Sequence, residues 1–291
     1  MLYNALAPLI SDFPVLNLFR YLTFRTGGAI MTALIISFVM GPRVINWLKS
    51  RQGSASNIRE DVPDTHLKKA GTPTMGGFLI LLSISVSTLL WAETTNAYVW
   101  IVLIVTIGFG AVGFADDYLK LSRKNSKGLS GRLKLLFQLI ISIGAAIWIL
   151  QLTQPPLNDA LVFPFFKSVL INLGWGFVPF AAFVMIGSSN AVNLTDGLDG
   201  LAIMPALIAA ACFALIAYVS GNFVFSEYLQ IHFVRGAGEL AVFCGALVGA
   251  GVGCGMGFPL EPPHPVVRSR LRAASARAAC RGLGSVIECP L

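Results

Sequence analysis

The chain has 291 residues, of which 55% are hydrophobic and only 12% are charged, and its mean hydropathy is +0.74. Soluble domains carry about 25% charged residues, so this composition excludes an ordinary soluble protein. The net charge of +7 is typical of a membrane protein with basic loops, and no aromatic-and-basic pattern indicates nucleic-acid binding. The five cysteines form no C-x-x-C pair and the three histidines are scattered, so the sequence predicts neither a zinc site nor a disulfide framework.

Seven apolar stretches predict membrane-spanning helices, because each approaches the roughly 20 residues that cross the hydrocarbon core. Residues 1–20 precede them, lack the pattern of a cleaved signal peptide and are expected at the membrane interface. The second to fourth stretches have the clearest pattern, and the glycine-rich seventh has the weakest. We therefore expect an all-α, polytopic integral membrane protein with spans near 26–42, 73–91, 98–116, 133–151, 174–192, 200–219 and 238–257.

The distribution of Lys and Arg predicts which loops face the cytoplasm. The loops after the first, third and fifth spans carry twelve of these residues, against four on the opposite side. Basic loops stay in the cytoplasm, so the first set faces inward and the N-terminus faces outward. Three polar motifs then share the cytoplasmic face, as a site built from helix ends requires: KKAGTPTMGG (68–77), FADDYLK (114–120) and NAVNLTDGLDG (190–200).

Asp116 and Asp117 follow apolar residues at the inner end of the third predicted span. Ionisable groups at this depth are costly, and they usually face a cavity, a partner or an ion. Adjacent carboxylates point in different directions on a helix, so one can meet a metal while the other meets a proton. The competing interpretation is a solvated helix end beside Lys120, which we disfavour because acidic residues at a helix C-terminus oppose the helix dipole.

Asn190, Asn193, Asp196 and Asp199 recur every three residues, and each aspartate is followed by a glycine. The two glycines suggest that the helix breaks here, which would expose backbone groups to a cavity where the amides can bind a polar ligand. The alternative is an Asp-Gly turn between two hairpinned helices. Such a turn explains one Asp-Gly pair, but not both pairs together with two upstream asparagines.

Lys68 and Lys69 precede small and hydroxylated residues at the entrance to the second predicted span. Free N–H groups at a helix N-terminus suit a phosphate, and lysine adds a mobile positive charge. The alternative is a pair of positive-inside lysines with Thr72 as a helix cap and Pro73 in the first turn. GFGAVG at 108–113 matches a dinucleotide-binding pattern but follows no strand, so it predicts close helix packing instead.

Lysines, threonines, amides and carboxylates on one membrane face indicate a site for an anionic substrate and a divalent cation. Mg²⁺ prefers few carboxylates together with the substrate's own phosphates. Phosphoryl transfer requires such charge neutralisation and in-line positioning. The residues therefore predict an enzyme that joins a water-soluble phosphorylated donor to a lipid acceptor at the cytoplasmic membrane face.

The segments GTPTMGG (71–77), GFADDY (113–118) and SNAVNLTDGLDGLAIMP (189–205) are long and specific. They resemble motifs of the bacterial phospho-N-acetylmuramoyl-pentapeptide transferases (translocase I), which belong to the polyprenyl-phosphate N-acetylhexosamine-1-phosphate transferases. Ser189 stands where the family has glycine. The resemblance extends from residue 21 to about residue 251 and includes the segments KGLSGRLK (127–134) and AGEL (237–240).

The resemblance implies transfer of phospho-MurNAc-pentapeptide from its UDP carrier to undecaprenyl phosphate, which gives lipid I and UMP in peptidoglycan synthesis. It also implies a Mg²⁺ requirement and a multi-pass location in the bacterial cytoplasmic (inner) membrane, among membrane lipids, with the active site on the cytoplasmic face. A second copy of the chain is a further candidate partner, in a homodimer.

Asp116 matches the family aspartate held either to deprotonate the lipid phosphate or to act as the nucleophile, and both alternatives stay open. Asp117 matches its neighbour, which is linked to catalysis or to the metal. The remaining residues match family positions around the uridine and diphosphate of the donor, or are the threonines of the GTPTMGG motif. This predicted substrate-binding set is Lys69, Thr72, Thr74, Asn190, Asn193, Asp196 and Asp199.

The sequence also departs from the family, which has ten spans and a later Phe-Met-Gly-Asp motif and histidine-rich loop, both missing here. From residue 258 the chain has five Arg, no Lys and no apolar span. We expect a membrane transferase domain at 1–257 and an aberrant tail at 258–291, which arises from a frameshift near 250–256 or is a genuine basic variant. With a frameshift, we expect an inactive fragment that lacks the main metal ligand of the family.

Three other functions stay open as alternatives. A sister enzyme that uses UDP-GlcNAc would share the aspartates, so the choice of sugar rests on the resemblance alone. An intramembrane prenyltransferase would require two Asn/Asp-x-x-Asp clusters, and Asp116 with Asp117 supplies half of one. An ion transporter would place its acidic residues near the bilayer midplane rather than at one end.

Overall fold

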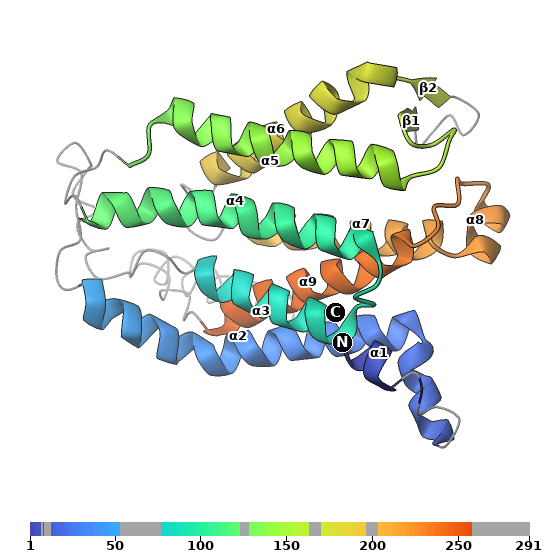
Figure 1. Cartoon of the computed structure of the whole chain (residues 1–291). Helices are drawn as coiled ribbons and strands as arrows, with labels where there is room; N and C mark the ends of the chain where they lie inside the picture. Colours follow the sequence, from blue (N-terminus) through green and yellow to red (C-terminus); the bar gives the residue numbers. More distant parts are fainter. Residues whose placement is uncertain are drawn as a thin grey trace, which may run out of the picture. The chain divides into compact units, whose positions relative to one another are not determined.

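A computed structural model describes residues 1–6, 8, 13–52, 77–122, 128–162, 170–195 and 203–257 (Figure 1). Contacts within the chain divide it into two compact units, Met1–Gly257 and Phe258–Leu291. The second unit, which contains the tail expected at 258–291, lies outside the described residues. The first unit contains every element described below.

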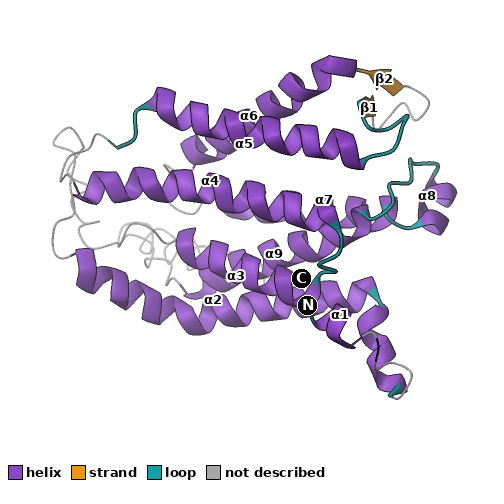
Figure 2. Cartoon of the chain, in the orientation of Figure 1, coloured by secondary structure: helices purple, strands orange, loops and turns teal. Residues whose placement is uncertain are grey.

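Helices make up most of the described structure (Figure 2). The short helices α1 (Leu2–Leu6) and η2 (Pro14–Arg20) come first. The longer helices are α2 (Leu22–Gln52), α3 (Gly77–Trp91), α4 (Ala97–Ser122), α5 (Gly131–Leu152), α6 (Phe177–Thr195), α7 (Ile203–Ser220) and α9 (Leu240–Gly257). The antiparallel strands β1 (Ala160–Val162) and β2 (Leu170–Asn172) and the turn η4 (Gly174–Gly176) connect α5 to α6. Between α7 and α9 lie α8 (Phe223–Leu229) and η5 (Ala237–Glu239).

Each predicted span coincides with one of the longer helices, which confirms the all-α, polytopic fold class. Within the described ranges, six stretches are long and apolar enough to cross a membrane. The seventh long helix, α3, is not among the six because only 15 of its residues are described. Its predicted start at 73–76 lies outside the described residues. The glycine-rich α9, which was expected to have the weakest pattern, belongs to the six.

Helix α9 lies at the centre of the packing because its residues are small. It buries 72% of its membrane-crossing stretch, whereas the other five bury 22% or less. A Cβ atom on Gly249 would overlap the carbonyl oxygen of Ile30, and one on Gly253 would lie 2.8 Å from the carbonyl oxygen of Leu34. Glycine at these positions lets the backbones of α9 and α2 approach closely, as in other membrane helix pairs.

The predicted close packing at 108–113 is confirmed for two of its glycines. A Cβ atom on Gly108 would come within 3.0 Å of Ile141 on α5, and one on Gly110 would overlap Leu81 on α3. Gly113 has open space around its Cβ position. These two glycines therefore pack α4 closely against its neighbours α5 and α3.

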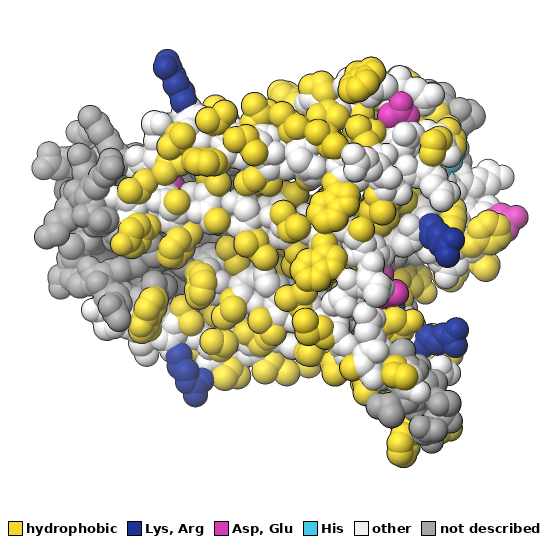
Figure 3. All heavy atoms as spheres, in the orientation of Figure 1, with side chains coloured by type: hydrophobic (Ala, Val, Ile, Leu, Met, Phe, Trp, Pro, Cys, Tyr) yellow, Lys and Arg dark blue, Asp and Glu magenta, His cyan; other side chains and the backbone are white. Residues whose placement is uncertain are grey.

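The surface has the distribution of side chains that a membrane environment requires. Figure 3 shows apolar side chains covering the middle of one face, while Lys and Arg lie towards the two ends. Many large apolar residues on α4 to α7 are exposed, including Ile104, Ile140, Phe183 and Phe213. Because exposed apolar surface of this extent is stable in lipid and not in water, the arrangement agrees with a bundle that crosses the bilayer.

The helices alternate in direction, so that their ends form two groups. In Figure 1 the C-terminal ends of α2 and α4 and the N-terminal ends of α3 and α5 lie at one end of the bundle. We call this the motif end, because the first two predicted polar motifs adjoin these helix termini. The third adjoins the C-terminal end of α6, where Asn190 bonds to Gln138 in the N-terminal half of α5. The first of the motifs lies mostly outside the described residues.

At the opposite end of the bundle a buried ion pair joins distant segments. Arg25 on α2 donates to both carboxylate oxygens of Glu239 in η5, at 2.8 and 2.6 Å. The Glu239 carboxylate also accepts a hydrogen bond of 2.9 Å from the backbone N–H of Glu93, between α3 and α4. The guanidinium of Arg25 lies 4.6 Å from the ring centroid of Tyr3. These contacts hold α2, η5 and the connection between α3 and α4 together at the end of the bundle opposite the motif end.

Candidate active site

Asp116 and Asp117 lie within the last two turns of α4, and both are partly exposed. The sequence placed them at the end of a span, but the helix continues for five residues beyond Asp117 to Ser122. No glycine or proline interrupts the chain before Gly128, so nothing in the sequence stops the helix at the aspartates. The pair therefore projects from a regular helix rather than from a frayed terminus.

Asp116 connects α4 to the start of α5. One of its carboxylate oxygens, Oδ1, accepts a hydrogen bond of 2.7 Å from the backbone N–H of Leu129. Leu129 precedes Ser130, the N-cap residue of α5, so the carboxylate lies beside the positive end of the α5 dipole. The bond fixes the orientation of the Asp116 carboxylate relative to the start of α5.

Asn190 is held on α6 by two hydrogen bonds. Its Nδ2 donates to the backbone oxygen of Ile186 at 2.9 Å and to Oε1 of Gln138 on α5 at 3.0 Å. Gln138 is only 3% exposed. Gln138 belongs to none of the three polar motifs, so the motifs do not indicate it as a site residue. It is nevertheless the single polar residue in the apolar run LLFQLII (135–141), and such a residue in a span usually has a partner.

The structure places four of the predicted site residues. Asp116 and Asp117 lie on α4, and Asn190 and Asn193 lie near the end of α6, where Asn193 is exposed. Helix α5 connects the two groups, because the segment before it binds Asp116 and its second turn binds Asn190. The predicted helix break also falls in a gap, since α6 is described to Thr195 and α7 from Ile203. The other predicted site residues lie outside the described residues: Lys69, Thr72, Thr74, Asp196 and Asp199.

The donor set for a metal ion is small in the part of the chain that the structure describes. There, no group of three or more His, Cys, Asp and Glu side chains could hold a metal ion. Asp116 and Asp117 supply two adjacent carboxylates. Carboxylates in this number suit Mg²⁺, which takes most of its other ligands from water and substrate phosphates. The chemistry of the donor set therefore fits a weakly held Mg²⁺ whose coordination is completed by a phosphorylated substrate.

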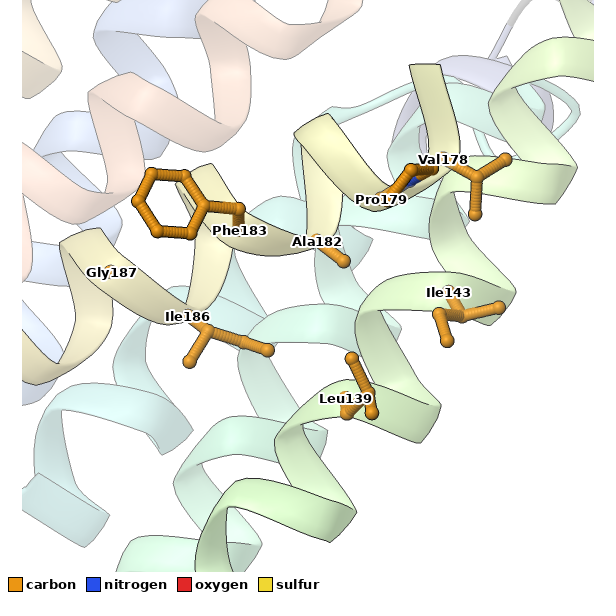
Figure 4. Close-up of a pocket in the computed structure, with 8 residues that line it drawn as sticks. All are labelled: Leu139, Ile143, Val178, Pro179, Ala182, Phe183, Ile186 and Gly187. Carbon is orange, nitrogen blue, oxygen red and sulfur yellow. The ribbon is translucent and has the colours of Figure 1, made fainter. Parts of the chain in front are cut away.

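An apolar groove of about 470 Å³ opens between α5 and α6 (Figure 4). Leu139 and Ile143 line it from α5, and Phe183, Ile186 and Gly187 are among the residues that line it from α6. Leu139 follows Gln138 directly on α5, and Ile186 lies one helical turn before Asn190 on α6. The groove thus begins next to the pair Gln138 and Asn190, and its lining suits a hydrocarbon chain rather than a polar ligand.

Comparison with known proteins identifies this combination of helices and polar residues. Residues 99–258 match the model of glycosyl transferase family 4, so the chain is a membrane-spanning member of this class. Residues 69–81 match signature 1 of phospho-N-acetylmuramoyl-pentapeptide-transferase. Over 254 residues the chain is 59% identical to the phospho-N-acetylmuramoyl-pentapeptide-transferase of Granulibacter bethesdensis, covering 87% of this chain and 70% of that relative. The chain therefore belongs to the phospho-N-acetylmuramoyl-pentapeptide-transferase family.

Proposed function

We propose that the chain transfers phospho-MurNAc-pentapeptide from UDP-MurNAc-pentapeptide to undecaprenyl phosphate in peptidoglycan synthesis. In a direct transfer, an oxygen of the lipid phosphate attacks the sugar-linked phosphorus of the donor, and the bond to the second phosphate breaks. In a two-step transfer, Asp116 breaks that bond by attacking the same phosphorus, and the lipid phosphate then displaces Asp116. The products are lipid I and UMP. The observation that carries this proposal is the 59% identity to a relative of that name over 254 residues, which is 87% of the chain.

The two sequence matches cover all of the proposed site residues. Signature residues 69–81 include Lys69, Thr72 and Thr74, which we assign to the donor phosphates. The family model at 99–258 includes both aspartates of α4 and the motif at 190–200. We assign the latter motif to the uridine and diphosphate, with the binding residues Asn190, Asn193, Asp196 and Asp199.

Asp116 acts on the lipid phosphate as a base, or forms a covalent intermediate as the nucleophile. Both roles require a carboxylate of fixed orientation, and the 2.7 Å bond from Leu129 supports this requirement. Asp117 contributes a ligand for Mg²⁺, and the phosphates of the donor supply others. When bound, Mg²⁺ would neutralise the negative charge that develops on the departing UMP.

The lipid substrate places the reaction at the surface of the bacterial inner membrane, with the motif end towards the cytoplasm. The groove between α5 and α6 is apolar and begins one turn from Asn190, so it can receive hydrocarbon of the acceptor while the phosphate stays at the helix ends. This arrangement requires the acceptor to approach within the bilayer and the UDP donor to approach from water. We also propose that the active form is a homodimer.

Release of UMP tests the proposal directly. Purified chain in micelles, with Mg²⁺, undecaprenyl phosphate and UDP-MurNAc-pentapeptide, should release UMP at a rate that Asp116→Asn abolishes. UDP-GlcNAc in place of the muramoyl donor distinguishes the sister enzymes that share the aspartates. A rate equal to that of Asp116→Asn, or a preference for UDP-GlcNAc, would overturn the assignment.

A further inference from the structure

We propose that Gln138 is a positioning residue for donor binding, which acts by orienting the side chain of Asn190. This inference rests on the proposed function, because it assigns Asn190 to the donor site. Gln138 itself lies on a different helix and outside the three polar motifs. It therefore adds an element of the site that motif comparison does not indicate.

The two hydrogen bonds of Asn190 determine the orientation of both amides. The backbone oxygen of Ile186 can only accept, so the Asn190 atom that lies 2.9 Å from it must be the nitrogen. The same nitrogen lies 3.0 Å from Gln138, so the Gln138 atom facing it must be the oxygen. Both N–H donors of Asn190 are thereby used, and its Oδ1 is the atom presented to a ligand. An acceptor suits the N3–H of a uracil ring better than it suits a phosphate.

The burial of Gln138 makes its hydrogen bond to Asn190 costly to break. Gln138 is 3% exposed and lies about 10 Å along α5 from the first residue of that helix. A buried amide without a partner loses the full free energy of desolvation, so rotation of Asn190 away from Gln138 is unfavourable. Without Gln138, only the Ile186 bond would restrain Asn190, and its side chain could adopt other rotamers. Gln138 thus keeps the acceptor of Asn190 in place before the donor arrives.

A purely structural role is the competing explanation, because the same hydrogen bond joins α5 to α6. The two explanations predict different effects on ligand binding. A structural bond changes the unfolding temperature and leaves the affinity of the folded protein unchanged. A positioning bond changes the dissociation constant of the donor, and only while Asn190 is present.

The test is the dissociation constant of UDP-MurNAc-pentapeptide, measured by calorimetry with the full chain in micelles. Gln138→Leu removes the acceptor and should weaken binding about fivefold to tenfold, the equivalent of one net hydrogen bond. Gln138→Glu keeps an acceptor oxygen at the same place and should recover most of the affinity. In an Asn190→Ala background, Gln138→Leu should cause no further loss. Ser142→Ala, one turn further along α5, is the matched control, because it removes a buried hydroxyl without a described partner.

The outcomes are distinct. Equal affinity for Gln138→Leu and the unsubstituted chain would overturn the inference, and so would an additive loss in the Asn190→Ala background. An unsubstituted chain that does not bind the donor would instead overturn the proposed function, and this result is visible before any substitution is compared. A lower unfolding temperature for Gln138→Leu with unchanged affinity would assign the bond to structure alone.

Discussion

The carboxylate of Asp116 and the backbone N–H of Leu129 are joined by a hydrogen bond of 2.7 Å across the connection between α4 and α5. The donor belongs to the backbone, so ordinary substitutions at position 129 leave it intact. The orientation of Asp116 therefore depends on the path of the chain just before α5. The segment just before α5 therefore orients the proposed catalytic Asp116 through its backbone, without supplying a catalytic side chain.

Leu129→Pro removes this donor, because proline has no N–H. We expect UMP release to fall about tenfold or more, since a hydrogen bond to a charged group contributes about 1.5–3 kcal/mol. Leu129→Ala keeps the N–H and should stay close to the unsubstituted rate. The measurement is kcat at saturating substrates, with the unfolding temperature as a check on folding. A Leu129→Pro chain that folds and turns over normally would show that this bond does not orient Asp116.

Asp116 and Asp117 should respond differently to the loss of charge. Asp116→Asn keeps an oxygen that accepts from Leu129, so the helix connection stays while the base or nucleophile is lost. We expect UMP release at background level at every Mg²⁺ concentration. Asp117→Asn should instead raise the Mg²⁺ concentration needed for half-maximal rate, because a ligand of the ion is weakened. Titration of the rate with Mg²⁺ separates the two, and identical curves for both variants would contradict this division of roles.

Arg25 and Glu239 should contribute strongly to stability as a pair. Removal of one partner of a buried ion pair leaves an uncompensated charge and typically costs about 3–5 kcal/mol. Arg25→Leu should therefore lower the unfolding temperature by many degrees, whereas Arg25→Leu combined with Glu239→Leu should lower it less. Arg20→Leu, an exposed neighbour, is the control and should have little effect. Additive losses for the two single changes would show that the pair is not coupled in the folded state.

The sequence was sufficient for the fold class because hydrophobic length alone identifies a span, and every predicted span is a helix. It was insufficient to predict which helix is buried most. The apolar pattern of α9 is weak because of its glycines, and the same glycines allow α9 to pack at the centre of the bundle. Hydropathy measures the fit of a helix to lipid and contains no information on its protein neighbours.

The sequence likewise indicates some of the site residues but not their hydrogen-bond partners. Asp116 and Asn190 stand out because polar residues are rare in such a chain. The partners of these residues do not stand out, because Leu129 acts through its backbone and Gln138 is a single glutamine 52 positions from Asn190. Arg25 and Glu239 are 214 positions apart, and only the packing of the helices brings them together.

At the contact between α2 and α9, we expect a single added methyl group to lower stability. Gly249→Ala would bring a Cβ atom onto the carbonyl oxygen of Ile30, so the two backbones must separate. Overpacking of this kind costs about 1–3 kcal/mol, and the unfolding temperature should fall. Gly144→Ala in α5 is the matched control, because its Cβ position is open and alanine favours the helix by up to about 1 kcal/mol. We therefore expect shifts of opposite sign for the same chemical change. A Gly249→Ala chain as stable as Gly144→Ala would show that α9 and α2 are not in backbone contact.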